Sequence, residues 1–159
     1  MDSEFSINER FDFLDTYLKL VMSGKMSSLI ITGEAGIGKS YTVKKEIARH
    51  SAKSGISVSF VKGFSTARAL YDALYHNRSG LIIFDDCDSV IEDKVAINIL
   101  KGALDSYDER IISWLSKSND KSVPSSFNFQ GKIIFISNLP IDRFDLAMKS
   151  RALIIDLKM

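Results

Sequence analysis

Apolar residues gather in five short, nearly continuous runs along the chain, and the stretches between these runs have helical spacing. Strands that are covered on both faces show such continuous runs, whereas strands with one wet face alternate apolar and polar residues. Strands that alternate with helices predict an α/β fold with a parallel sheet. The predicted strands are residues 29–32, 58–61, 81–84, 133–137 and 153–157, and the predicted helices are residues 39–51, 66–76, 94–105 and 142–148.

Two segments lie outside this alternation. Residues 1–27 are predicted to be an N-terminal helical segment, because Ser6-Ile7-Asn8-Glu9 has the form of a capping box and apolar residues follow at helical spacing. Residues 106–131 contain two β-prone stretches around a polar centre. They predict a β-hairpin inserted before the fourth strand, with Trp114 at its base, and a plain surface loop is the alternative.

Composition narrows the class of protein. The chain has 159 residues, of which 45% are hydrophobic, so a single domain with a well-filled core is expected. Its 21 basic and 20 acidic side chains nearly cancel, so any contact with a polyanion would have to be local. The single cysteine, Cys87, excludes a disulfide framework. No apolar run approaches the ~20 residues of a membrane span, so we expect a cytoplasmic protein with no membrane partner.

The sequence GEAGIGKS at positions 33–40 follows a predicted strand and precedes a predicted helix. It fits the phosphate-binding pattern G-x-x-x-x-G-K-S, in which glycines let backbone N–H groups approach phosphates. Lys39 can reach the β- and γ-phosphates of a nucleotide, and the Ser40 hydroxyl can ligate Mg²⁺. A chance glycine-rich turn is the alternative. The predicted nucleotide-binding residues are Gly33, Glu34, Ala35, Gly36, Ile37, Gly38, Lys39, Ser40 and Tyr41.

The run LIIFDD at positions 81–86 predicts a buried strand that ends in two carboxylates. Ligands of open parallel sheets bind beyond the carboxyl ends of the strands, where the phosphate loop also lies. Asp85 is therefore expected to hold Mg²⁺, and Asp86 to orient or deprotonate an attacking water. The alternative is a solvated turn in which Asp85, Asp86 and Asp88 only cap the next helix.

Another apolar run, IIFISN at positions 133–138, ends in polar residues, and Ser150-Arg151 precede the last predicted strand. Together with the phosphate loop and the acidic strand end, these features resemble the AAA+ ATPases over residues 29–157. The resemblance implies a three-layer α/β/α sandwich whose five-stranded parallel sheet has the order 5-1-4-3-2. It also implies that the cofactors are ATP and Mg²⁺, and that the chain assembles with itself in a ring or other homo-oligomer.

The resemblance assigns roles to two further residues. Asn138 matches the sensor 1 position, which helps hold the attacking water, and Arg151 matches the arginine finger offered to a neighbouring subunit's nucleotide. The alternatives are a turn residue before Pro140 for Asn138 and an ordinary cation at a helix C-terminus for Arg151. The chain departs from the family at Asp86, where most members have glutamate, and it ends at Met159, where a helical lid would begin.

The hairpin segment bears on the substrate. Many AAA+ proteins, and the similar superfamily 3 helicases of small viruses and plasmids, carry a hairpin here that points into the central channel of the ring. By this resemblance Lys117 and Lys121 would follow a phosphate backbone, and Lys62 and Phe64 match the other channel-facing loop. We expect an ATPase that translocates along or remodels DNA or RNA, in the replication or packaging of a virus or mobile element.

Three alternatives stay open. A protein-remodelling ATPase would use the same loops on an extended polypeptide. A nucleotide-dependent switch or binding module would need little turnover. A nucleoside kinase, the chief rival on the same fold, would usually show an arginine-rich lid and an acceptor pocket, and the sequence shows neither feature.

Overall fold

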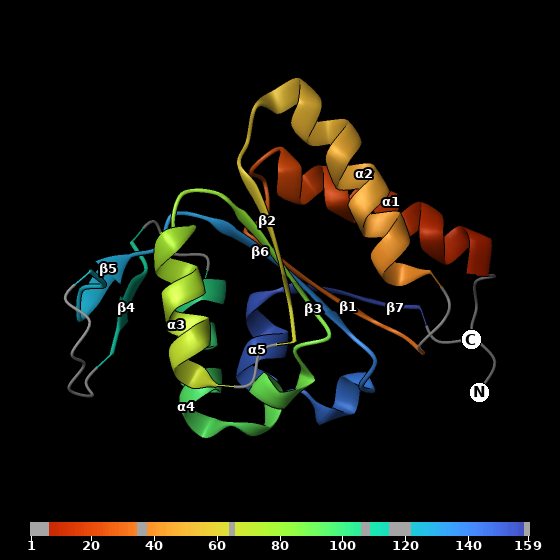
Figure 1. The fold of residues 1–159 in the computed structure, drawn as a ribbon. Coiled ribbons are helices and arrows are strands. Elements are labelled where there is room, and N and C mark those ends of the chain that lie inside the picture. Colours follow the sequence, from red (N-terminus) through yellow and green to blue (C-terminus); the bar gives the residue numbers. More distant parts are fainter. Residues whose placement is uncertain (1–6, 35–37, 64–65, 106–108, 115–121, 158–159) are drawn as a thin grey trace.

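A computed structural model of the chain shows a five-stranded parallel sheet with helices on both faces (Figure 1). The structure describes residues 7–34, 38–63, 66–105, 109–114 and 122–157. The strands of this sheet are β1 (Ser28–Thr32), β2 (Val58–Lys62), β3 (Leu81–Asp85), β6 (Lys132–Ser137) and β7 (Leu153–Asp156). β1 and β3 are buried along their whole length, which agrees with their continuous apolar sequences.

Neighbouring strands of the sheet follow the order β2-β3-β6-β1-β7, and every pair is parallel. If the five strands of this sheet are numbered 1 to 5 along the chain, their order starting from β7 is 5-1-4-3-2, as expected. The labels differ from this count because β4 and β5 form a separate sheet. β6 therefore lies between β1 and β3, with Ser137 opposite Thr32 and Ile136 opposite Asp85 at the carboxyl ends.

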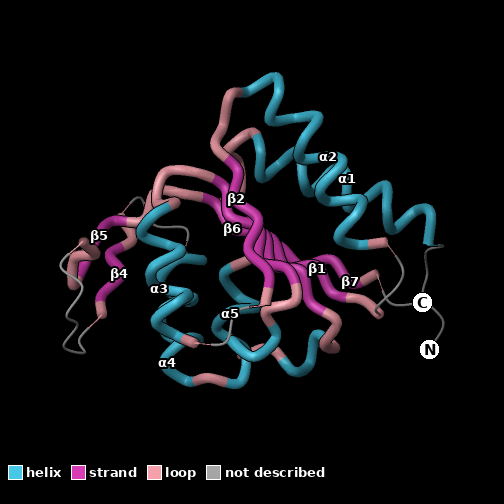
Figure 2. Tube along the Cα trace, viewed as in Figure 1, coloured by secondary structure: helices cyan, strands magenta, loops and turns pink. Residues whose placement is uncertain are grey.

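Two layers of helices cover the sheet (Figure 1 and Figure 2). α1 (Ile7–Met22) and α2 (Lys39–Ser54) cover one face, and α3 (Ala67–His76), α4 (Lys94–Leu104) and α5 (Leu146–Arg151) cover the other. Each face has its own cluster of buried apolar side chains. Among the residues that the structure describes, no helix combines the length and the apolar character that crossing a membrane needs.

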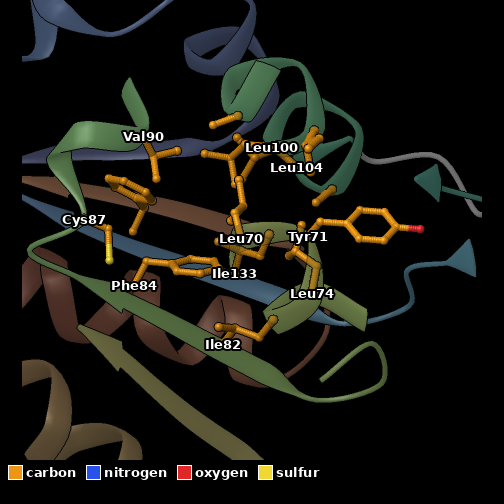
Figure 3. Close-up of a cluster of buried hydrophobic side chains, with 14 of the residues drawn as sticks. Leu70, Tyr71, Leu74, Ile82, Phe84, Cys87, Val90, Leu100, Leu104 and Ile133 are labelled. Atoms are coloured by element: carbon orange, nitrogen blue, oxygen red, sulfur yellow. The ribbon is translucent and has the colours of Figure 1, made fainter. Parts of the chain in front are cut away.

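The cluster between the sheet and helices α3 and α4 is built from aliphatic and aromatic side chains (Figure 3). Leu70 and Leu74 of α3 lie there with Leu100 of α4, over Ile82 and Phe84 of β3. Fully burying one such side chain contributes about 1.5–3 kcal/mol, so this layer binds the helices firmly to the sheet.

The segment before β6 contains two antiparallel strands. They are β4 (Ile111–Ser113) and β5 (Ser126–Asn128). They pair as the predicted hairpin requires, and residues 115–121 between them lie outside the described residues. Tyr71 of α3 links them to the core, because its ring centre lies 5.8 Å from that of Trp114 and its hydroxyl donates to the Pro124 carbonyl at 2.5 Å. Figure 3 shows the Tyr71 ring extending from the buried cluster with its hydroxyl directed outward.

One predicted helix is wrong in its bounds. Residues 142–148 do not form a continuous helix, because a short 3-10 turn, Ile141–Arg143, precedes the separate helix α5. Phe144 between them has an extended backbone and is buried, so the chain turns into the core at this position. Asp145 then begins a new helix, since its side chain accepts from the N–H of Ala147 at 2.8 Å.

Arg110 joins the hairpin to the rest of the fold. The residue is 9% exposed, and its guanidinium donates to the carbonyl oxygens of Ala103, near the end of α4, and of Gly131, just before β6, each at 2.7 Å. The guanidinium also lies 4.9 Å from the centre of the Phe129 ring. Burial lowers the pKa of Arg110, and the charge of Asp105 partly offsets this shift. The side chain therefore fixes α4, the hairpin and β6 to one another.

Replacing Arg110 should destabilise the fold. In Arg110→Ala two buried carbonyl oxygens lose charged donors, so we expect the free energy of unfolding to fall by about 2–4 kcal/mol. Urea denaturation followed by circular dichroism measures this change. Arg78→Ala is the matched control, because Arg78 is exposed and its guanidinium contacts only the nearby Tyr75 among the described residues, through a hydrogen bond to the carbonyl and a cation–π contact with the ring at 4.4 Å. Equal losses of stability in the two variants would contradict the role given to Arg110.

Candidate nucleotide-binding site

A polar cleft of about 280 Å³ lies at the edge of the sheet where β1, β3 and β6 end. Its walls come from the beginning of α2, the ends of β2 and β3, and the residue that follows β6. The residues that line it are Gly38, Lys39, Ser40, Tyr41, Lys62, Asp85, Asp86 and Asn138. The structure thus brings together side chains that the sequence assigns to nucleotide, Mg²⁺ and water, and these roles stay predictions.

Helix α2 begins directly at this cleft. Gly38, which precedes its first turn, has φ of 88°, a left-handed conformation that strains any residue with a Cβ atom. The carbonyl of Gly38 accepts from the N–H of Thr42, whereas the first N–H groups of a helix have no partner within it. Such a helix end attracts anions. Ala35, Gly36 and Ile37, the middle of the predicted phosphate loop, lie outside the described residues.

The ammonium group of Lys39 joins the ends of β1 and β6. Lys39 is 5% exposed, and its Nζ donates to the carbonyl oxygens of Gly33 and Glu34 and to Oδ1 of Asn138, each at 2.8 Å. Burial lowers the pKa of Lys39, and the charges of two nearby aspartates partly offset this shift. All three acceptors are neutral, so a phosphate group would be a stronger partner for the ammonium.

Two carboxylates follow one another at the end of β3, and their environments differ. Asp85 is 8% exposed, whereas Asp86 is an exposed residue. Asp86 has φ of 57°, and among the described residues it is the only non-glycine residue with positive φ. This conformation costs roughly 1–2 kcal/mol for most side chains, and aspartate is one of those that tolerate it best. Backbone strain of this kind is typical of functional positions.

The cleft contains oxygen ligands that suit Mg²⁺. The Ser40 hydroxyl and the Asp85 carboxylate both belong to residues of its lining, and hydroxyl, carboxylate and phosphate oxygens are the ligands that this ion prefers. Tyr41, the next residue of α2, also lines the cleft and is 72% exposed. The residues present therefore fit a Mg²⁺–nucleotide complex.

Two side chains fix the turn around Asn138 in a way that the sequence does not reveal. The Ser137 hydroxyl donates to Oδ1 of Asp88 at 2.7 Å and accepts from the N–H of Leu139 at 3.0 Å. Because Ser137 and Leu139 flank Asn138, these bonds hold the turn after β6 against the turn after β3. The acidic run DDCD draws attention to Asp88, but a local pattern does not show that this carboxylate accepts a hydrogen bond from the end of β6.

Arg151 lies away from this cleft. The hydroxyl of Ser28, which begins β1, donates to the Arg151 carbonyl at 3.3 Å, so Arg151 lies at the opposite edge of the sheet. Its guanidinium donates to the Ala147 carbonyl of its own helix at 2.8 Å, and its Nε lies 3.6 Å from the Asp105 carboxylate. Arg151 is therefore not part of the cleft of its own chain, and its action on a neighbouring subunit stays a prediction.

One of the four residues predicted to bind nucleic acid is described. Lys62, the last residue of β2, lies opposite Asp85 in the strand register and lines the polar cleft. Its charge therefore acts on this cleft. Phe64, Lys117 and Lys121 lie outside the described residues.

No protein-family model matches the chain. The chain is 33% identical over 147 residues to an uncharacterized 36.7 kDa protein of the nrdC-mobD intergenic region of Enterobacteria phage T4. The match covers 89% of this chain and 45% of the phage protein, so the chain spans about half the length of that relative.

Solved structures show the same type of fold. The structure of Rhizobiales Trip13 has a TM-score of 0.57 at 12% identity, over 99% of this chain and 67% of that chain. A chain in the E. coli MS115-1 HORMA:CdnC:Trip13 complex has a TM-score of 0.60 at 12% identity, over 98% and 67% of the two chains. C. elegans PCH-2 has a TM-score of 0.50 at 17% identity, over 99% and 43%. At these identities the similarity concerns the fold alone.

Two substitutions of Asp86 should separate the effect of its charge on ATP turnover from the effect of its backbone conformation on stability. Asparagine tolerates positive φ, so Asp86→Asn should change the free energy of unfolding by less than about 0.5 kcal/mol and still abolish ATP turnover. Asp86→Ala should abolish turnover and also lower the stability, by about 1 kcal/mol. Chemical denaturation and an assay of phosphate release measure both effects. If Asp86→Asn hydrolyses ATP at the wild-type rate, the carboxylate has no part in the reaction.

Proposed function

We propose that the chain is the core of a Mg²⁺-dependent ATPase that assembles into an oligomer and acts on a protein partner. One observation carries the ATPase proposal: Lys39, Asp86 and Asn138 line the same polar cleft at the N-terminus of α2. A cation at a phosphate-binding helix end can hold the nucleotide, and a carboxylate and an amide can orient the attacking water, as phosphoryl transfer to water needs.

Each side chain has a defined task in this proposal. Lys39 exchanges its neutral acceptors for phosphate oxygens, and the exchange releases the amide oxygen of Asn138. Asn138 and Asp86 then orient a water whose oxygen attacks the γ-phosphorus, while the bond to the β–γ bridging oxygen breaks and Asp86 accepts the proton. Mg²⁺, held by Ser40 and Asp85, neutralises charge on the phosphates when it is bound.

Three observations favour a protein substrate over nucleic acid. The similar folds are those of Trip13 and PCH-2, and one of these structures is a complex of Trip13 with HORMA and CdnC. Lys62, the one described residue predicted to bind nucleic acid, lines the nucleotide cleft instead. The chain also has a formal net charge of only +1, whereas nucleic-acid affinity comes mainly from contacts between cations and phosphates.

Assembly with further copies completes the catalytic site in this proposal. The described lining of the cleft contains no arginine, and Arg151 lies at the opposite edge of its own sheet. An arginine finger accelerates phosphoryl transfer about 10³- to 10⁵-fold, because it stabilises the charge that builds on the γ-phosphate. In an oligomer, Arg151 would leave its ion pair with Asp105 and enter the neighbouring cleft.

The first experiment measures ATP hydrolysis with and without candidate substrates. We expect slow hydrolysis by the chain alone, stimulation by an unfolded protein, and no stimulation by single-stranded DNA, duplex DNA or RNA. Lys39→Ala should lose ATP binding and at least about 10²-fold in turnover, because it removes the cation of the cleft. Lys45→Ala, an exposed position on the same helix, is the control and should keep both.

Two outcomes would contradict the proposal. Stimulation of ATP hydrolysis by nucleic acid, with none by unfolded protein, would show that the substrate is a nucleic acid. Full ATPase activity of Lys39→Ala would show that ATP is not hydrolysed in this cleft.

The second experiment asks whether Arg151 acts on a neighbouring subunit. Arg151→Ala and Lys39→Ala should each be inactive alone, and a mixture should partly recover, because some interfaces then join an intact cleft to an intact arginine. Arg143→Ala is the control, since Arg143 is an exposed residue whose guanidinium pairs with Glu92 at 2.6 Å. A mixture that stays inactive although mixed oligomers form would leave Arg151 with the role of a helix-end cation only.

A further inference from the structure

Helices α1 and α2 hold a second cluster of ligating side chains, apart from the nucleotide cleft. Asp15 lies on α1, and Glu46 and His50 lie one turn apart on α2. One ligand atom from each of the three residues lies within 4.8 Å of the other two. A metal ion with bonds of about 2.0–2.2 Å holds its ligand atoms about 3–4 Å apart, so small adjustments of the three side chains would complete such a site.

Two polar atoms of this cluster have no hydrogen-bond partner among the described residues. They are Oδ1 of Asp15 and Nε2 of His50, and both atoms are shielded from solvent. Leaving a buried polar atom unsatisfied costs about 1–3 kcal/mol, so native proteins rarely retain one without a ligand, an ion or a water. Here one unsatisfied polar atom from each of two helices lies at the same place.

The cations around the cluster leave these two atoms available. Lys19 lies 3.0 Å from the other carboxylate oxygen of Asp15, and Arg49 lies 2.5 Å from one carboxylate oxygen of Glu46. Arg49 comes only within 3.7 Å of Oδ1 of Asp15. The side chains of Lys19 and Arg49 are 56% and 57% exposed, so water screens their charges and both can turn away at little cost.

The cluster can be reached from solvent. A cleft of about 270 Å³ opens between the ends of α1 and α2, and His50 is part of its wall together with Lys19 and Met22. The His50 side chain therefore lies between this opening to solvent and the shielded ligand atoms, so a turn of that side chain would admit an ion.

We propose that Asp15, Glu46 and His50 bind one Zn²⁺ ion, which fixes α1 to α2. Two carboxylates and an imidazole are ligands that zinc accepts, and water can take the fourth position. The imidazole also separates this site from the Mg²⁺ site at Ser40, because Mg²⁺ prefers oxygen ligands. Ser40 and His50 are ten residues apart on α2, or about 15 Å along the helix, so the zinc ion does not touch the nucleotide.

The test is a calorimetric titration of the chelator-treated chain with ZnCl₂ in excess Mg²⁺. We expect one zinc ion per chain and a rise in the melting temperature that Mg²⁺ alone does not produce. His50→Gln and Asp15→Asn, on the two different helices, should each weaken zinc binding about tenfold or more. His76→Gln is the matched control, because His76 is the other histidine of the chain and lies at the end of α3.

Two further variants sharpen the outcome. Arg49→Ala should bind zinc more tightly, because it frees the Glu46 carboxylate and removes a repelling charge, and Lys39→Ala should bind zinc as the wild type does. Zinc binding of equal strength in His50→Gln and the wild type would overturn the proposal. So would a wild-type chain that binds no zinc, in which case the cluster is an ion-pair network only.

Discussion

The placement of β6 between β1 and β3 is the constraint on which the rest of the candidate site depends. Parallel strands present their carboxyl ends at the same end of the sheet, so this order puts the beginning of α2, the acidic turn and Asn138 beside one another. The strand register then decides which residues meet, with Ser137 opposite Thr32. Because of this register, Lys39 reaches Asn138, which lies 99 positions further along the chain.

The cleft is arranged in advance, and this arrangement has a cost in stability. Lys39 loses hydration on burial, and three neutral oxygen acceptors only partly replace the lost water. Asp86 keeps a backbone conformation that costs roughly 1–2 kcal/mol for most residues. The buried strands and the apolar clusters on both faces of the sheet offset these costs. Groups that are already oriented need no reorganisation when charge develops on a phosphate.

The two ends of the strands in the sheet carry different features. The polar cleft lies at the carboxyl ends of the strands, whereas Arg151 and the hairpin lie toward their amino ends, since Arg151 bonds to Ser28 and Arg110 bonds to Gly131. β6 runs between these ends of the sheet, with Gly131 just before it beside the hairpin and Asn138 just after it in the cleft. A contact made at the hairpin is therefore linked to the cleft through a single buried strand.

The sequence by itself determined the strands, most of the helices, the hairpin strands and the described residues of the cleft other than Lys62, because apolar period, glycine spacing and strand-end carboxylates are local patterns. Only the tertiary structure decided the bond from Ser137 to Asp88, the break before Asp145 and the cluster of Asp15 with His50. Each of these depends on contacts between segments that are distant in the chain, or on how a side chain enters the core. Local periodicity carries no information on such contacts, since strand order and helix packing set them.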